Sequence, residues 1–182
     1  MSRIELLVPI MHDEVAPAVG TLAPRRRLRP GAQLTLIDNG KPKARMLLQR
    51  IAEGLRDRLD LGEVAVYVKG SASRVISEAE AAALATVSGV VIAGLGDCGA
   101  CSVCSVGDAL RMELAGVPAT VVISDVFVGH VASFARSMGF PGYQTVVVPH
   151  PVSSKSEDQL AAFARAVVDD VADQLVGTSD VL

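Results

Sequence analysis

The chain has 182 residues, of which 50% are hydrophobic and only 3% aromatic, and its formal net charge is −3. This length and composition predict one domain, spanning residues 1–182, with an aliphatic core. The near-neutral charge argues against a nucleic-acid partner, and the sequence shows neither a membrane-spanning run nor a signal peptide, so we expect a cytoplasmic protein.

Short apolar strands alternate with amphipathic helices along most of the chain. An N-terminal strand at residues 4–10 and a connector rich in Pro and Arg come first, up to residue 30. The pattern then predicts strands at 34–37, 64–68, 90–94, 119–123 and 145–148, each followed by a helix, and a frayed tail from residue 177. Local signals mark the helix ends: the capping pair Ser77 and Glu80, Pro42 at a first helical position, and the stop glycines Gly116 and Gly139.

Strands that alternate with helices form βαβ units, in which the strands pair in parallel and the helices cover both faces of the sheet. The sequence therefore predicts a three-layer α/β sandwich with a mainly parallel sheet, flavodoxin-like or Rossmann-like. Ligands of such sheets bind beyond the carboxyl ends of the strands. That rule gathers five segments on one edge of the sheet: 38–41, 69–71, 94–104, 124–125 and 149–151.

The three cysteines of the chain, Cys98, Cys101 and Cys104, lie between an apolar strand and a predicted helix. A helix N-terminus carries partial positive charge and free N–H groups, which favour a thiolate over a thiol. The spacing of Cys98 and Cys101 is typical of a pair in which the first thiol attacks and the second resolves the adduct as a disulfide. Cys104 lies one helical turn further on and is a reserve thiol.

Three other interpretations of this segment stay open. Metal or iron–sulfur binding suits the cysteine spacing, with Asp97 or His150 as a further ligand, although a closed zinc site usually brings two ligand pairs. The glycines of residues 94–99 match a dinucleotide-binding pattern, but they do not open the first βαβ unit, which disfavours nucleotide binding. The cysteines can also be plain buried core residues.

Polar residues and glycines on the same edge are candidates for contacting a substrate. His150, between two prolines, is either a loop histidine stiffened by its neighbours or a general acid or a group that holds a substrate carboxylate. A carboxylate disfavours a neighbouring thiolate, so a turn or hydrogen-bonding role suits Asp97 best. The candidates predicted to bind substrate are Asp38, Asn39, Lys41, Gly96, Asp97, Gly99 and Ser124.

The segment 97–101, Asp-Cys-Gly-Ala-Cys, resembles the signature of the UGSC family, whose motif begins with selenocysteine in some members and with cysteine in others. The likeness extends from about residue 21 and includes, in the same order, residues 36–42, 71–74, 116–118 and 149–151. It implies that Cys98 occupies the selenocysteine position and Cys101 the final cysteine, and it adds Ser73 to the substrate-binding candidates. The chain departs from the family pattern at three positions: Ala100 replaces a serine, Cys104 an aromatic residue and Gly107 a histidine.

A more distant similarity is to the selenocysteine-bearing part of component B of glycine, sarcosine and betaine reductases. In those enzymes the selenol displaces an amine from the carbon next to a carboxylate, so the resemblance implies sulfur attack on carbon with loss of a leaving group. We therefore expect a reductase- or lyase-type enzyme in which Cys98 attacks a small carboxylate- or carbonyl-bearing substrate and Cys101 resolves the adduct.

We expect the enzyme to use no cofactor and no metal. We expect it to have a thiol reductant or a partner subunit and to form a homo-oligomer. The alternative is a non-catalytic subunit of a larger complex that binds a metal or an iron–sulfur cluster or carries sulfur.

Overall fold

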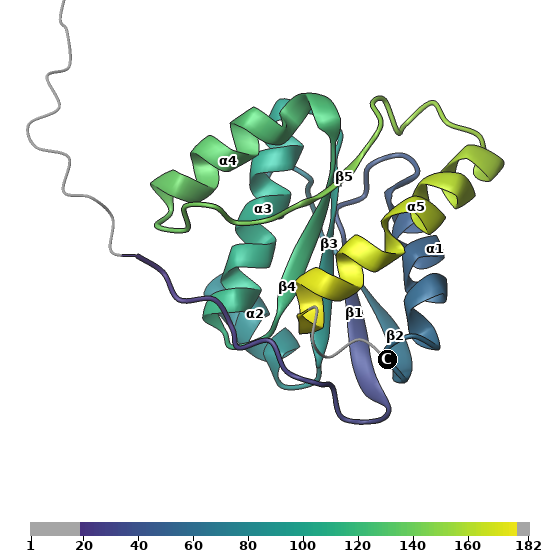
Figure 1. Cartoon of the computed structure of the whole chain (residues 1–182). Coiled ribbons are helices and arrows are strands. Elements are labelled where there is room, and N and C mark those ends of the chain that lie inside the picture. The colour runs from purple at the N-terminus through teal and green to yellow at the C-terminus, as the bar shows by residue number, and fades with distance from the viewer. Residues whose placement is uncertain (1–18, 178–182) are drawn as a thin grey trace, which may run out of the picture.

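A five-stranded sheet forms the centre of the computed structural model, which describes residues 19–177 (Figure 1). Its strands are β1 (Ala32–Asp38), β2 (Leu61–Val68), β3 (Val90–Gly96), β4 (Ala119–Ser124) and β5 (Val146–Val148). All neighbouring strands pair in parallel, in the order β2-β1-β3-β4-β5. This is the strand order of flavodoxin-like folds, so the predicted parallel α/β sandwich is confirmed.

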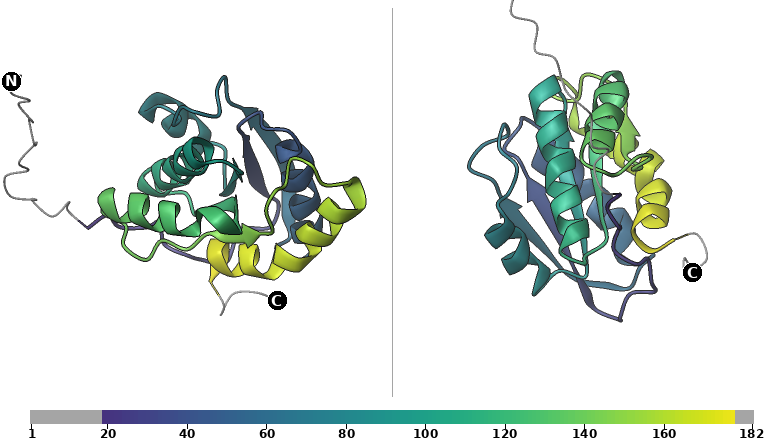
Figure 2. Two further views of the ribbon diagram at one scale, coloured as in Figure 1. Left: turned by 90° about the horizontal axis from the view of Figure 1, so that it is seen from above. Right: turned by 90° about the vertical axis from the view of Figure 1, so that its left-hand side faces the viewer.

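Five helices cover the two faces of the sheet. The helices α1 (Ala44–Arg56) and α5 (Glu157–Val176) pack on one face, and the helices α2 (Glu78–Ala85), α3 (Gly99–Leu114) and α4 (Val128–Ser137) pack on the other (Figure 2). Side chains alternate along β1, so Leu36 belongs to the first core and Ile37 to the second. The central strand β3 is buried along its whole length, which explains its unbroken apolar sequence.

The signals that were expected to bound the helices act as predicted in three places. Ser77 accepts a hydrogen bond from the Glu80 N–H, while the Glu80 carboxylate accepts one from the Ser77 N–H, which completes the capping box of α2. Gly116 and Gly139 follow α3 and α4 with φ values of 84° and 87°. Glycine adopts this left-handed conformation without steric cost, so both helices stop there.

Other boundaries differ from the prediction. Pro42 does not open a helix, because α1 begins at Ala44 and Lys43, with φ of 68°, is its N-cap. The last strand begins at Val146 rather than at residue 145. Gly177 still belongs to the fold, as it caps α5 and donates its N–H to the Asp173 carbonyl. The strand predicted at 4–10 and residues 178–182 lie outside the described residues.

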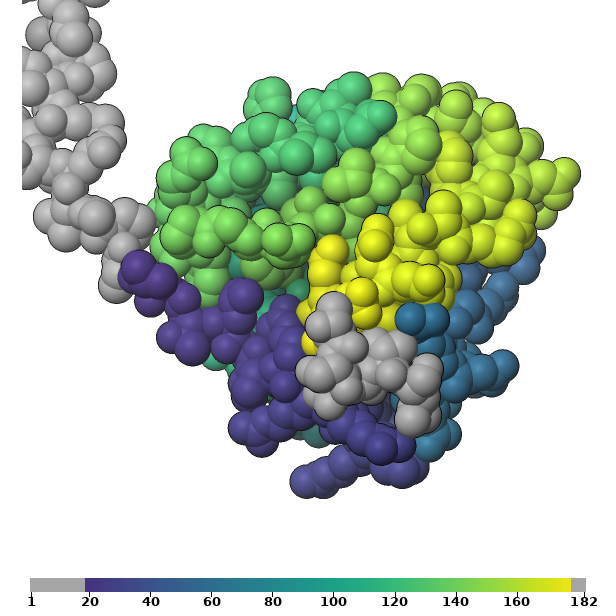
Figure 3. All heavy atoms as spheres, in the orientation of Figure 1, coloured from purple at the N-terminus to yellow at the C-terminus, as the bar shows by residue number. Residues whose placement is uncertain are grey.

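The connector that leads to β1 is fixed to the fold by one arginine. Both terminal nitrogens of Arg25 donate to the buried Glu113 carboxylate at 2.7 Å, and its Nε donates to the Gln174 carbonyl at 2.8 Å. Figure 3 shows the connector, in purple, beside α5, in yellow. Within residues 19–177, no helix has the length and apolar content needed to cross a membrane.

Candidate functional site

The carboxyl ends of β1 and β3 lie side by side at the centre of the sheet. The chain leaves β1 for α1 on one face and leaves β3 for α3 on the opposite face. Such a switch point leaves an opening at the edge of a parallel sheet, where ligands of this fold class bind. The two segments that leave it carry Lys41 and Cys98, and the Lys41 ammonium lies close enough to act on the Cys98 sulfur.

Cys98 is the N-cap of α3, and its Sγ accepts a hydrogen bond from the Cys101 N–H at 3.3 Å. The two sulfur atoms lie 2.6 Å apart, and both thiols are free. Cys98 is half-buried, whereas Cys101 is fully buried below it. The structure therefore brings together the two thiols that the sequence pairs, with the first one open to solvent.

The surroundings of the three thiols give them different pKa values. Burial disfavours the Cys98 thiolate, but hydrogen bonds from the Cys101 thiol and N–H, together with the Lys41 ammonium, outweigh it and lower the pKa of Cys98 below the ordinary value. Burial and the adjacent Cys98 sulfur raise the pKa of Cys101 to about 11. Burial also raises the pKa of Cys104. Near neutral pH, Cys98 is thus the thiol that ionises most readily.

The lysine at this site offers a direct test of that electrostatic argument. Substitution Lys41→Met removes the cation beside Cys98, so we expect the pKa of Cys98 to rise and its alkylation by iodoacetamide at neutral pH to slow by about threefold to tenfold. Above the ordinary thiol pKa both proteins are ionised, and the two rates should converge. Peptide mass spectrometry of Cys98 as a function of pH measures both limits.

The matched control for this substitution is Lys43→Met. Lys43 lines the same cavity of about 480 Å³ as Lys41 but is not among the groups that shift the pKa of Cys98. Lys43→Met should therefore leave the rate of Cys98 alkylation unchanged. Equal slowing in the two variants would mean that general positive charge, and not the Lys41 contact, activates the thiol.

Asp97 fastens the loop after β5 to the end of β3. Its carboxylate accepts hydrogen bonds from the N–H groups of Val152 and Ser153 at 3.1 Å and lies 3.0 Å from His150 Nδ1. Burial disfavours the carboxylate, but these N–H groups, the Ser124 hydroxyl and the neighbouring His150 prevail and lower the pKa of Asp97. The hydrogen-bonding role proposed for Asp97 thus agrees with its contacts, which run to the protein's own backbone.

His150 is held on its Nδ1 side and by its ring. The Ser124 hydroxyl lies 3.0 Å from Nδ1 and 3.2 Å from the Gly96 carbonyl, and the ring of Phe127 meets the imidazole edge-on at 5.6 Å. Ser124 is therefore placed beside His150, and both lie on the sheet edge that the sequence predicted.

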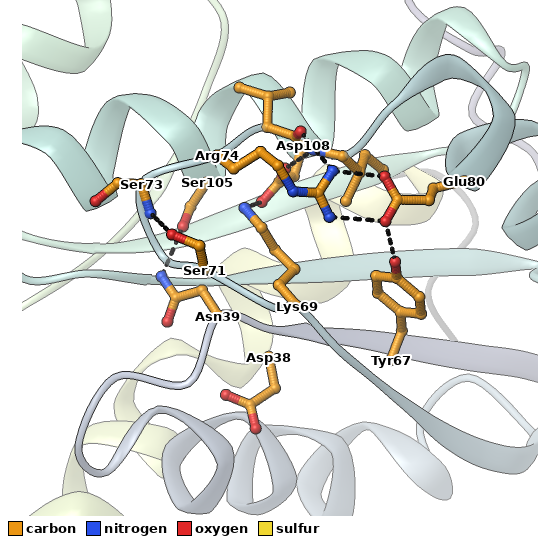
Figure 4. A network of polar contacts seen from close by, with 12 residues as sticks. Asp38, Asn39, Tyr67, Lys69, Ser71, Ser73, Arg74, Glu80, Ser105 and Asp108 are labelled. Carbon is orange, nitrogen blue, oxygen red and sulfur yellow. Dashed lines mark hydrogen bonds and ion pairs between the residues drawn. The ribbon is translucent and has the colours of Figure 1, made fainter.

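Asp38 and Asn39 are buried and already engaged in the fold. The Asp38 carboxylate accepts from the Gly40 N–H and from Arg45 Nε, both at 2.9 Å. Asn39 Nδ2 donates to the Leu95 carbonyl and to Ser105 Oγ, which joins the turn after β1 to β3 and α3. In Figure 4 Asp38 points away from the group that contains Asn39. Substrate binding by these two residues stays a prediction.

The remaining candidates differ in the space around them. A side chain at Gly96 would collide with Ile123 and Ser102, at 2.7 and 2.9 Å, so glycine lets α3 approach the end of β3. Gly99 is exposed and has open space around it. Ser73 is exposed on the loop after β2, where its N–H donates to Ser71 Oγ (Figure 4).

A buried ion pair next to the site was not identified from the sequence. Lys69 Nζ lies 2.5 Å from Asp108 Oδ2, with both side chains almost fully buried, and Asp108 Oδ1 accepts from the Ile76 N–H at 2.8 Å (Figure 4). Their charges act on Cys104, one turn before Asp108 on α3. The available signal was a single aspartate among the apolar residues of a helix and a lysine directly after an apolar strand.

No group of three or more His, Cys, Asp or Glu side chains within the described part of the chain is arranged to hold a metal ion. Two larger cavities, of about 600 and 590 Å³, lie away from the cysteines, one against the connector and one between α2, α3 and α4.

The chain is similar to known proteins both in structure and in sequence. Among solved structures, the chain is similar to the crystal structure of diflavin flavoprotein A3 from Nostoc sp., with 16% identity, a TM-score of 0.42, and coverage of 81% of this chain and 95% of that chain. No curated protein matches the sequence at a significant level. A family model matches residues 5–177, and the chain therefore belongs to the UGSC family.

Proposed function

We propose that this protein is a cysteine-dependent enzyme that cleaves a carbon–heteroatom bond next to a carbonyl or carboxylate group. The observation that carries the proposal is the pair of thiols at the start of α3. Cys98 is half-buried beside Lys41, and Cys101 is buried 2.6 Å behind it. The first sulfur has the lower pKa, which suits a nucleophile, and the second is positioned to attack the first.

The first step is a displacement at carbon. The Cys98 thiolate attacks the carbon that carries the leaving group, so that a sulfur–carbon bond forms. The leaving group departs with the electrons of the broken bond and takes up a proton. The product of this step is a thioether on Cys98, with no change in the oxidation state of either cysteine.

The second step resolves the thioether. The Cys101 sulfur attacks Cys98 Sγ, a disulfide forms, and the electrons of the sulfur–carbon bond pass to the carbon. That carbon then takes a proton, which balances the one that Cys101 loses. The substrate has gained two electrons and the cysteine pair has lost two, so a thiol reductant must restore the pair.

The second step explains why the substrate needs a carbonyl or carboxylate. Negative charge develops on the carbon as the sulfur leaves, and an adjacent carbonyl accepts it as an enolate oxygen. The N–H groups of Gly99 and Ala100 are without an acceptor among residues 19–177, and together with Lys41 they suit stabilisation of that oxygen. A reducing cytoplasm, which keeps thiols free, and a homo-oligomeric assembly remain part of the proposal.

The test uses 2-bromoacetophenone, which supplies both a leaving group and a carbonyl. The reduced protein should be alkylated at Cys98 and should then release one acetophenone per chain as the Cys98–Cys101 disulfide forms. Benzyl bromide is the matched control, because it alkylates a thiol but has no carbonyl to accept the charge, so its adduct should persist. A stable phenacyl adduct on the wild-type protein would exclude the proposed reaction.

A further inference from the structure

The Asp97 carboxylate determines which nitrogen of His150 carries the proton. Its low pKa keeps it ionised near neutral pH, and an ionised carboxylate can only accept hydrogen bonds. The 3.0 Å contact between Asp97 Oδ1 and His150 Nδ1 is therefore a hydrogen bond only if Nδ1 bears a hydrogen. The two loop N–H groups bound to the same carboxylate fix its position.

The Ser124 hydroxyl is consistent with the same assignment. Its hydrogen has two groups to donate to, the Gly96 carbonyl 3.2 Å away and the Asp97 carboxylate, and both of these can only accept. Its oxygen then offers a lone pair to His150 Nδ1, 3.0 Å away. Asp97 and Ser124 are thus two acceptors facing one N–H.

His150 Nε2 is left as the nitrogen that can exchange a proton. It forms no hydrogen bond with any residue from 19 to 177, and the side chain is 34% exposed. The contact with Phe127 restricts rotation of the ring. Asp97 also donates its own N–H to Cys101 Sγ at 3.3 Å, so one residue contacts both the imidazole and the resolving thiol.

We propose that Asp97 and Ser124 are positioning residues that hold His150 as the Nδ1–H tautomer, so that the free Nε2 takes up the proton that Cys101 loses and passes it to the carbon released from Cys98. This inference rests on the proposed function. Nε2 of this tautomer carries no hydrogen, so it first accepts the Cys101 proton, directly or through water, and then transfers it to the carbon. The reaction therefore needs no other acid.

The tautomer can be measured without any substrate. Nitrogen NMR of protein labelled in its three histidines, with His150→Gln to assign the signal, should show the neutral His150 imidazole protonated on Nδ1 in the wild-type protein. Asp97→Asn should shift the population toward the Nε2–H form, because an amide group can donate to Nδ1. A wild-type imidazole protonated on Nε2 would overturn the assignment.

A double-mutant cycle separates positioning of His150 from simple support of the loop. Release of acetophenone from the preformed Cys98 adduct should slow by about 10²- to 10⁴-fold in His150→Ala, and by a similar factor in Asp97→Asn. If Asp97 acts through the imidazole, Asp97→Asn should add nothing in the His150→Ala background. If Asp97→Asn instead slowed release in that background by the same factor as it does alone, Asp97 would act through the backbone of the loop and not through the imidazole.

The two readouts also separate this inference from the proposed function. If wild-type protein releases no acetophenone, the proton-delivery role fails together with the reaction, while the tautomer is still decided by NMR. If release is normal but both single variants are as fast as wild type, the reaction stands and the role assigned to His150 and Asp97 is wrong.

Discussion

Cys98→Ser is expected to reduce acetophenone release to the background rate, and Cys101→Ser is expected to trap the phenacyl adduct on Cys98. The hydroxyl is a far weaker nucleophile than a thiolate at neutral pH, so the first variant never forms the adduct. The second variant keeps the nucleophile and loses only the thiol that attacks it. Intact-mass spectrometry should show unmodified protein in one case and a stable adduct in the other.

Cys104→Ser is the control for both variants. Burial raises the pKa of this third thiol, and its sulfur takes no part in the 2.6 Å contact between Cys98 and Cys101. The variant should therefore be alkylated by 2-bromoacetophenone and release acetophenone as the wild-type protein does. If all three variants released no acetophenone and none carried a phenacyl adduct, this would argue against attack by Cys98 followed by resolution by Cys101.

Lys69→Met should lower the free energy of unfolding by about 3–5 kcal/mol, because it leaves the Asp108 carboxylate buried without its counter-ion. The double variant Lys69→Met with Asp108→Leu should be more stable than the single one, since it removes both charges. Urea denaturation with a constant m-value measures the differences.

The surface pair of Arg50 and Glu53 is the comparison for this buried pair. Their side chains are 45% and 63% exposed, so Arg50→Met should cost no more than about 1 kcal/mol. If Lys69→Met proved as mild as Arg50→Met, the buried pair would not contribute to the stability of α3 and the neighbouring loop.

The fold could be predicted because its signals are local. Apolar strands, stop glycines and the capping pair of α2 are each read from a few neighbouring residues, and they are sufficient to place parallel strands between helices. Lys43 shows the limit of such signals. Proline is common at the start of helices, but the turn at Lys43 delays α1 by two residues after Pro42.

The candidate site could be predicted only in part. Cys98 and Cys101 are three residues apart, so their meeting follows from the helix itself. The contact of Asp97 with His150 joins residues 53 apart in the chain, and the pair of Lys69 and Asp108 joins residues 39 apart. Such contacts depend on the lengths and register of the intervening strands and helices, which residue types alone do not determine.

The most direct test of the central claim follows one molecule of 2-bromoacetophenone through the wild-type protein by peptide mass spectrometry. With one equivalent of reagent, the phenacyl group should appear first on Cys98 and then disappear as the Cys98–Cys101 disulfide accumulates at the same rate as acetophenone. First labelling of Cys104, or a Cys98 adduct that persists while Cys101 remains a free thiol, would contradict the account.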